Sequence, residues 1–270
     1  MHVILHPGFH KTGTSSLQRG LAAHDAVMSP RLRYVLMTEM PDVIRAARKY
    51  SRKPKPLNLT AFGQAFDTFI QGLNADETRP LLITSEDLSG LIPGKYGVET
   101  YAASSPLMAR AVDGLLTRFG PKTKIDVWYT TRAPEAWQRS VYYQLLRGVR
   151  LTDDFTSFQN IWANAARLDD VVAQTAQLVE GKAHVDAGRL ESCSGTALGP
   201  LGMFLDRYGI STEGLPPLPI ENVQPHGVAE ELLKINRSNM SDEVATEAKR
   251  RILNRHRSAG ATTQPAGGSK

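Results

Sequence analysis

The sequence predicts an α/β fold in which a central parallel β-sheet is flanked by helices, followed by a largely helical C-terminal part. Short apolar runs alternate with helical patterns, as they do in a parallel sheet covered on both faces. The 270 residues are 41% apolar and 22% charged, which allows a large core and excludes a disordered or collagen-like chain. The single cysteine, Cys193, excludes a disulfide scaffold and is most simply a partly buried thiol.

Four segments have the composition of buried strands. The run 1–6 is apolar and ends at a Pro-Gly pair, and 34–36 is a second short run. Segment 80–85 is mostly aliphatic, while 124–131 is rich in β-branched and aromatic residues. We expect these four segments to form the sheet.

The spacing of apolar residues predicts the helices. They are expected over 15–24, 42–50, 59–73, 101–119, from Pro134 onward, and over 155–162, 168–179, 198–208, 228–235 and 242–253. Beyond residue 257 the sequence has almost nothing to bury. We therefore expect one domain over 1–257 and a disordered tail over 258–270.

Charge and hydropathy limit the partners. Lys and Arg total 32 against 27 acidic residues, a net charge of +5 that suits anionic ligands, and no nucleic-acid partner is expected. No apolar run approaches the ~20 residues that span a bilayer, and no secretory signal is evident. With one cysteine in the chain, we expect a soluble cytoplasmic protein. The oligomeric state stays open.

The loop after the first predicted strand is the most informative segment. It reads GFHKTGTSS over 8–16 and lies between a buried strand and an amphipathic helix. Backbone N–H groups of a glycine-bearing turn, together with those of the helix start, form a cradle for an anion. Small residues leave this backbone accessible: Gly8, Thr12, Gly13, Thr14, Ser15 and Ser16. The loop therefore predicts a phosphate site.

This loop differs from the nucleoside-triphosphatase pattern G-x-x-x-x-G-K-[ST] in one respect. Gly8 and Gly13 have the required spacing and Ser15 supplies the hydroxyl, but Thr14 stands in the place of the lysine. The only lysine in the loop is Lys11. Because that chemistry needs the lysine and a metal on the terminal phosphates, the displacement argues against it and leaves phosphate binding intact.

The run LHPGFHKTGTSSLQ over 5–18 resembles the 5′-phosphosulfate loop of sulfotransferases that use 3′-phosphoadenosine 5′-phosphosulfate (PAPS), especially bacterial members with K-T-G-T-[ST]-S-L-Q. The resemblance implies a P-loop-type α/β fold and PAPS as the sulfuryl donor. It also implies that the 5′ side of the nucleotide is held by Lys11, Thr12, Gly13, Thr14, Ser15 and Ser16. Lys11 would in addition stabilise the leaving phosphate.

A second motif supports this resemblance. Arg132 follows the strand 124–131, and Ser140 lies eight residues later on the next helix, as in the family's 3′-phosphate motif. An arginine at the carboxyl edge of a parallel sheet faces the crevice in which such sheets bind ligands, and its guanidinium can bind a phosphate bidentately. The family often has Asp where Ala133 stands, so a capping residue for this helix is missing here.

Sulfuryl transfer to a hydroxyl needs a base for the acceptor proton, and we expect that base to be Glu86. It comes directly after a predicted core strand, and Thr84-Ser85-Glu86-Asp87-Leu88 resembles a family segment with a glutamate at this place. His10 is the rival, because it lies in the loop and imidazole titrates near neutral pH. Glu86 can also cap a turn or the start of a helix, and the neighbouring Asp87 can serve as the base or as the cap.

The sequence thus predicts a PAPS-dependent sulfotransferase that acts on a hydroxyl or amine and releases adenosine 3′,5′-bisphosphate (PAP). No metal site is expected, because no His/Cys cluster has zinc spacing. The acceptor is expected to be a small molecule or a carbohydrate, with sugars, lipids and small alcohols all open. The alternatives are a P-loop small-molecule kinase or another nucleoside-triphosphate enzyme, and a non-catalytic nucleotide-binding module.

Overall fold

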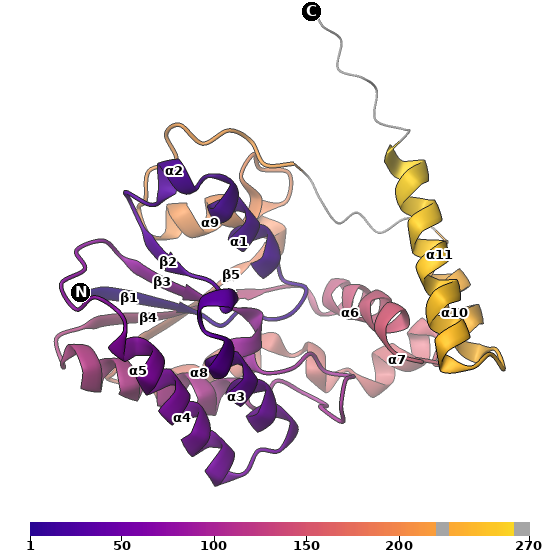
Figure 1. Cartoon of the computed structure of the whole chain (residues 1–270), viewed down its shortest axis with the longest axis horizontal. Coiled ribbons are helices and arrows are strands. Elements are labelled where there is room, and N and C mark those ends of the chain that lie inside the picture. The colour runs from indigo at the N-terminus through magenta and orange to yellow at the C-terminus, as the bar shows by residue number, and fades with distance from the viewer. Residues whose placement is uncertain (220–226, 262–270) are drawn as a thin grey trace, which may run out of the picture. The chain divides into compact units, whose positions relative to one another are not determined.

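The computed structural model describes residues 1–219 and 227–261, with side chains to residue 256. It contains a five-stranded, all-parallel sheet in the order β2-β3-β1-β4-β5 (Figure 1). The predicted α/β class is confirmed. The strands are β1 (His2–His6), β2 (Arg33–Val35), β3 (Leu81–Thr84), β4 (Lys124–Thr131) and β5 (His184–Arg189).

The chain divides into two compact units. The first comprises Met1–Trp137 and Trp162–Pro219, and the second comprises Gln138–Ile161 and the chain after Pro219. The single domain expected over 1–257 stays a prediction. The helices are α1 (Thr14–Ala23), α2 (Asp25–Met28), α3 (Pro41–Arg52), α4 (Pro56–Gln71), α5 (Ser104–Phe119), α6 (Pro134–Gly148), α7 (Phe155–Ile161), α8 (Leu168–Leu178), α9 (Gly199–Arg207), α10 (Val228–Arg237) and α11 (Asp242–Ala261).

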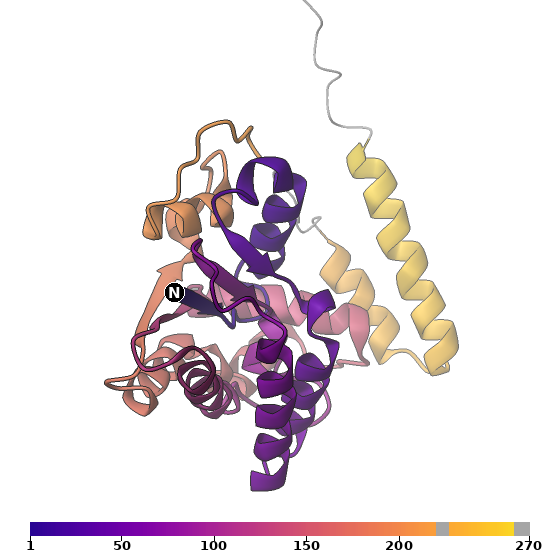
Figure 2. The ribbon, with the colours of Figure 1, turned by 60° about the vertical axis from the view of Figure 1, so that its left-hand side comes forward.

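Helices cover both faces of the sheet in the first unit. Ile4 of β1, Leu82 of β3 and Trp128 of β4 are fully or almost fully buried on one face, where Leu17 of α1 and Phe204 of α9 join them in one apolar cluster. Figures 1 and 2 show α3, α4, α5 and α8 on the opposite face. Because both faces are covered, β1 and β3 need continuous apolar runs, and their sequences have them.

Strand β5 corrects the sequence prediction, which has only four strands. It pairs with β4 alone and forms one edge of the sheet. Its sequence HVDAGR offers only Val185 and Ala187 as apolar residues between charged or small ones, and none of its side chains is fully buried. An edge strand of this kind lacks the apolar run by which the other strands are recognised.

The C-terminal end also differs from the expectation. Helix α11 continues to Ala261, four residues beyond the predicted boundary at 257. Residues 262–270, most of the expected disordered tail, lie outside the described residues.

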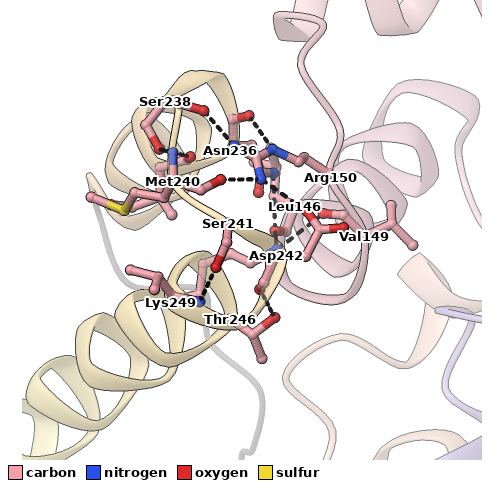
Figure 3. A network of polar contacts seen from close by, with 12 residues as sticks. Leu146, Val149, Arg150, Asn236, Ser238, Met240, Ser241, Asp242, Thr246 and Lys249 are labelled. Atoms are coloured by element: carbon pink, nitrogen blue, oxygen red, sulfur yellow. Dashed lines mark hydrogen bonds and ion pairs between the residues drawn. The ribbon is translucent and has the colours of Figure 1, made fainter.

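In the second unit, two basic side chains connect the C-terminal end of α6 to the hairpin of α10 and α11 (Figure 3). Lys249 of α11 is 6% exposed, and its Nζ donates to the carbonyl oxygens of Leu146 at 3.2 Å and Val149 at 3.1 Å. Arg150 donates to the carbonyl oxygens of Asn236 and Met240. The carbonyls of Leu146 and Asn236 lie in the last turns of α6 and α10, where a helix leaves carbonyl groups unpaired.

Substituting Lys249 tests this arrangement. Lys249→Met keeps the aliphatic length and removes both donors, so we expect the free energy of unfolding to fall by about 1–3 kcal/mol. Urea denaturation followed by circular dichroism measures the change. Arg251→Met on the same helix is the control, because Arg251 is exposed and pairs only with Glu247 among the described residues, and it should change stability by less than about 0.5 kcal/mol. Equal effects of the two variants would contradict this account.

Candidate functional site

The loop predicted to bind phosphate connects β1 to α1 and has the backbone of an anion cradle. Gly8, Lys11 and Gly13 have φ of 42°, 68° and 99°, so the chain turns sharply through the left-handed region three times. The carbonyl of Gly13 accepts from Ser16 N and Leu17 N, both at 3.0 Å, which starts α1. No side chain caps this helix end and no acidic residue lies in its first turn. Its N–H groups and positive dipole therefore suit an anion.

Thr14 is the second sign of a ligand in this loop. Its Oγ1 is buried and has no hydrogen-bond partner among the described residues. A Cβ built on Gly8 would lie 2.2 Å from this oxygen, so only glycine fits at position 8. A buried hydroxyl without a partner is costly, and an anion in the loop is a group that satisfies it.

The other predicted loop residues divide into anchors and exposed groups. The hydroxyl of Thr12, fully buried, contacts the carbonyl oxygen of Phe9 at 2.7 Å and Thr130 Oγ1 at 2.8 Å. It therefore holds the loop to β4. Ser15 is exposed and Ser16 is half-buried at the start of α1.

Arg132 lies against the loop, although 121 residues separate it from Lys11. Its Nη1 donates to the carbonyl oxygen of Lys11 at 3.2 Å, and its Nε is 3.9 Å from Glu191 Oε1. Burial lowers the pKa of Arg132, but a guanidinium stays charged at neutral pH. Trp137 Nε1 donates to the carbonyl oxygen of His10 at 3.0 Å, a second contact between the loop and the segment after β4.

Glu86 begins a short 3₁₀ helix, η2 (Glu86–Ser89), directly after β3. Burial and then the charge of Asp87 raise the pKa of Glu86 to about 7, while the charges of Lys11 and Arg48 oppose the rise. At neutral pH this carboxyl group is therefore close to half ionised, the condition in which it accepts and releases a proton most readily.

A salt bridge holds the residue next to Glu86. Arg48 of α3 binds the buried Asp87 with Nε to Oδ1 at 2.7 Å and Nη2 to Oδ2 at 2.8 Å. The hydroxyl of Ser85 accepts from Asp87 N at 3.2 Å. Asp87 is thus engaged by Arg48. The sequence alone does not reveal Arg48 as a site residue, because nothing along the chain relates α3 to η2.

His10, the rival base, is engaged elsewhere. Its Nδ1 is 3.1 Å from the hydroxyl of Tyr101, which also accepts from His10 N at 3.1 Å. Burial lowers the pKa of His10 to about 4. A group with this pKa is a weak base at neutral pH.

Ser140 lies on α6 and belongs to the second compact unit. Its pairing with Arg132 stays a prediction. Within the described part of the chain, no three His, Cys, Asp or Glu residues gather where they could hold a metal ion. No helix among the described residues is long and apolar enough to cross a bilayer.

Comparisons with known proteins identify a structural neighbour. No protein-family model and no curated protein sequence matches the chain. Among solved structures, the crystal structure of a sulfotransferase from Alicyclobacillus acidocaldarius is similar over 94% of this chain and 95% of its own, with 17% identity and a TM-score of 0.47. A likeness of this degree carries no argument about activity. An activity for this chain therefore has to be inferred from its own residues.

The Gly8–Thr14 contact makes a prediction about stability. Gly8→Ala forces a Cβ against Thr14 Oγ1 at a positive φ, so we expect the free energy of unfolding to fall by about 2–3 kcal/mol. Gly209→Ala is the control, because Gly209 has φ 62° but nothing within 4 Å of its added Cβ, and it should cost only about 1 kcal/mol. Urea denaturation compares the two. A smaller loss for Gly8→Ala than for Gly209→Ala would contradict the close packing of the loop.

Proposed function

We propose that this protein transfers a sulfuryl group from PAPS to a hydroxyl or amine acceptor and releases PAP. The observation that carries the proposal is the hydrogen bond from Arg132 to the carbonyl oxygen of Lys11. It joins the loop with the predicted 5′-phosphosulfate motif to the strand end with the predicted 3′-phosphate motif. A nucleotide with phosphate groups at both ends needs two anion sites near each other.

The residues of the loop fit such a nucleotide. The uncapped start of α1 offers backbone N–H groups, and the buried Thr14 hydroxyl lacks a partner among the described residues. In the proposal Gly13, Thr14, Ser15 and Ser16 bind the 5′ side and Thr12 holds the loop in shape. Arg132 binds the 3′-phosphate, with Ser140 of α6 as its second contact. PAPS, when bound, supplies the sulfuryl group and a phosphate leaving group.

Lys11 and Glu86 carry the chemistry in this proposal. Each influences the other electrostatically, since the charge of Lys11 lowers the pKa of Glu86. Glu86 takes the proton from the acceptor hydroxyl while the acceptor oxygen attacks sulfur. Lys11 stabilises the negative charge that develops on the leaving phosphate. The nucleoside-triphosphatase pattern has a lysine where this chain has Thr14. This difference disfavours ATP hydrolysis, the alternative chemistry for such a loop.

The pKa of Glu86 predicts how the rate depends on pH. Because the ionised form is the base, kcat/KM for the acceptor should fall about tenfold per pH unit on the acid side of a break at pH 7 or above, and level off on its alkaline side. Glu86→Gln should lower kcat by about 10²- to 10⁴-fold and leave PAP affinity within several-fold. Transfer of radiolabelled sulfate from PAPS at a series of pH values measures the two rate effects, and calorimetry measures the affinity for PAP.

Glu99→Gln is the matched control, since Glu99 is exposed and should leave the rate unchanged. An acid limb near pH 4 in the wild-type protein would indicate His10 as the base instead. A full rate in Glu86→Gln would remove Glu86 from the mechanism.

Calorimetry with PAP and adenosine 5′-monophosphate tests the 3′-phosphate site. The two nucleotides differ only in the 3′-phosphate, so the ratio of their affinities isolates that group from any loosening of the loop. Arg132→Ala should reduce the wild-type preference for PAP by about 1.5–3 kcal/mol, and Ser140→Ala by about 0.5–1.5 kcal/mol. Binding should not need magnesium. Magnesium-dependent binding of ATP in preference to PAP would contradict the proposal and favour the kinase alternative.

A further inference from the structure

A groove of about 680 Å³ runs along α3, outside the loop and the strand ends described above. Five of the nine residues that line it are cationic: Arg45, Arg48, Lys49, Arg52 and Lys53. Its volume is in the range of small-molecule sites.

One residue of the groove, Arg48, also contacts the segment of the proposed base. Arg48 lines it and also binds Asp87, the residue next to Glu86. The charge of Arg48 acts on Glu86 as well, where it lowers the pKa. Arg48 thus connects the groove to the segment that carries Glu86.

The cations of α3 lie on one side of the helix, which is unfavourable for the helix itself. Arg45, Arg48, Lys49 and Arg52 follow the spacing i, i+3, i+4, i+7. Like charges three and four residues apart destabilise a helix by about 0.2–0.5 kcal/mol per pair. The helix dipole favours Lys49 and Arg52 in the last turn but not Arg45 and Arg48.

Acidic partners offset only part of this charge. Arg45 forms an exposed ion pair with Asp42 at 2.7 Å, and Arg48 pairs with Asp87. Arg52 lies over the ring of Tyr96 at 5.0 Å. Lys49 and Lys53 have no acidic partner within 4.0 Å among the described residues. An excess of positive charge in a concave site is complementary to an anion.

Apart from Thr38, the rest of the groove is apolar. Met37, Pro41 and Ile44 line it beside the cations. A small inorganic ion would leave this surface uncovered. An organic molecule with a hydrophobic or ring portion covers it and places its charged group on the cations.

We propose that this groove binds the acceptor and that the acceptor is an organic anion, with a carboxylate, sulfate or phosphate group near the hydroxyl that becomes sulfated. The inference depends on the proposed function. The acceptor oxygen forms a bond to sulfur, the bond between sulfur and the phosphate oxygen of PAPS breaks, the electron pair leaves on PAP, and the hydroxyl proton goes to Glu86.

Matched pairs of acceptors test the inference. The first pair is 4-nitrophenyl β-D-glucuronide and 4-nitrophenyl β-D-glucoside, which differ only in a carboxylate or a hydroxymethyl group on the same ring. The second is 4-(hydroxymethyl)benzoate and its amide. Calorimetry measures the affinity of each compound for the protein saturated with PAP. In each pair the acid should bind about tenfold tighter than its neutral partner. Radiolabelled PAPS then shows whether each is sulfated.

The double variant Arg45→Gln with Lys49→Gln should abolish the preference for the acids and leave PAP affinity within twofold, about 0.4 kcal/mol. The control is Lys122→Gln with Arg167→Gln, which removes the same charge and an exposed ion pair of the same i, i+3 type elsewhere on the first unit, between Arg167 and Asp170. It should keep the preference.

Two failures are distinguishable. If PAP binds but neither acid is preferred to its neutral partner, or if the preference survives in the groove variant, the acceptor inference is wrong and the proposed function stands. If PAP does not bind while the acids bind through Arg45 and Lys49, the groove is an anion site and the sulfotransferase proposal is wrong.

Discussion

The position of β1 between β3 and β4 is the constraint on which the candidate site depends. In a parallel sheet the carboxyl ends of neighbouring strands lie at one edge, and the register pairs Leu5 of β1 with both Ile83 and Val127. The loop after β1, Glu86 after β3 and Arg132 after β4 therefore meet, although they are distant along the chain. Backbone hydrogen bonds of the sheet, and not contacts among the site residues, bring them to one place.

Contacts between side chains then fix how these segments face one another. Thr12 connects the loop to Thr130 of β4, and Arg132 contacts the carbonyl of Lys11. His6 contacts Thr84 of β3 at 2.8 Å through Nδ1, and its burial lowers its pKa to about 3. A neutral His6 inside the sheet is a structural group. These contacts connect the cradle to β3 and β4, and a site held in this way costs less entropy when a ligand binds.

The sequence shows β1 and β3 by their apolar runs and β4 by its β-branched and aromatic residues. It shows the loop because Gly8 and Gly13 stand at a fixed spacing. It does not show β5, whose edge position needs few apolar residues. Nor does it show that the Thr12 hydroxyl points inward to Thr130 while that of Thr14 lacks a partner in the described structure. Such directions depend on backbone dihedrals of the turn, which composition does not specify.

Arg48 illustrates a second limit of sequence reasoning. Helical periodicity predicts a helix over 42–50, and α3 covers Pro41–Arg52. The charge stripe on this helix is visible in the letters, yet its meaning depends on the contact with Asp87, 39 residues away. Only the packing of α3 against η2 relates the stripe to Glu86, because contacts between distant elements leave no local pattern in the chain.

The charges of two cations with different neighbours act on Glu86, and this coupling relates the proposed reaction to its two reactants. Lys11 belongs to the phosphate loop, whereas Arg48 lines the groove along α3. Both charges lower the pKa of Glu86, while its burial and the charge of Asp87 raise it. Negative charge brought to either side screens one of these cations, which weakens its hold on the ionised carboxylate. Binding of a nucleotide and an anionic acceptor together should therefore make Glu86 a stronger base than it is in the free protein. The carboxylate becomes most basic when both reactants are present, the moment at which a proton has to be accepted.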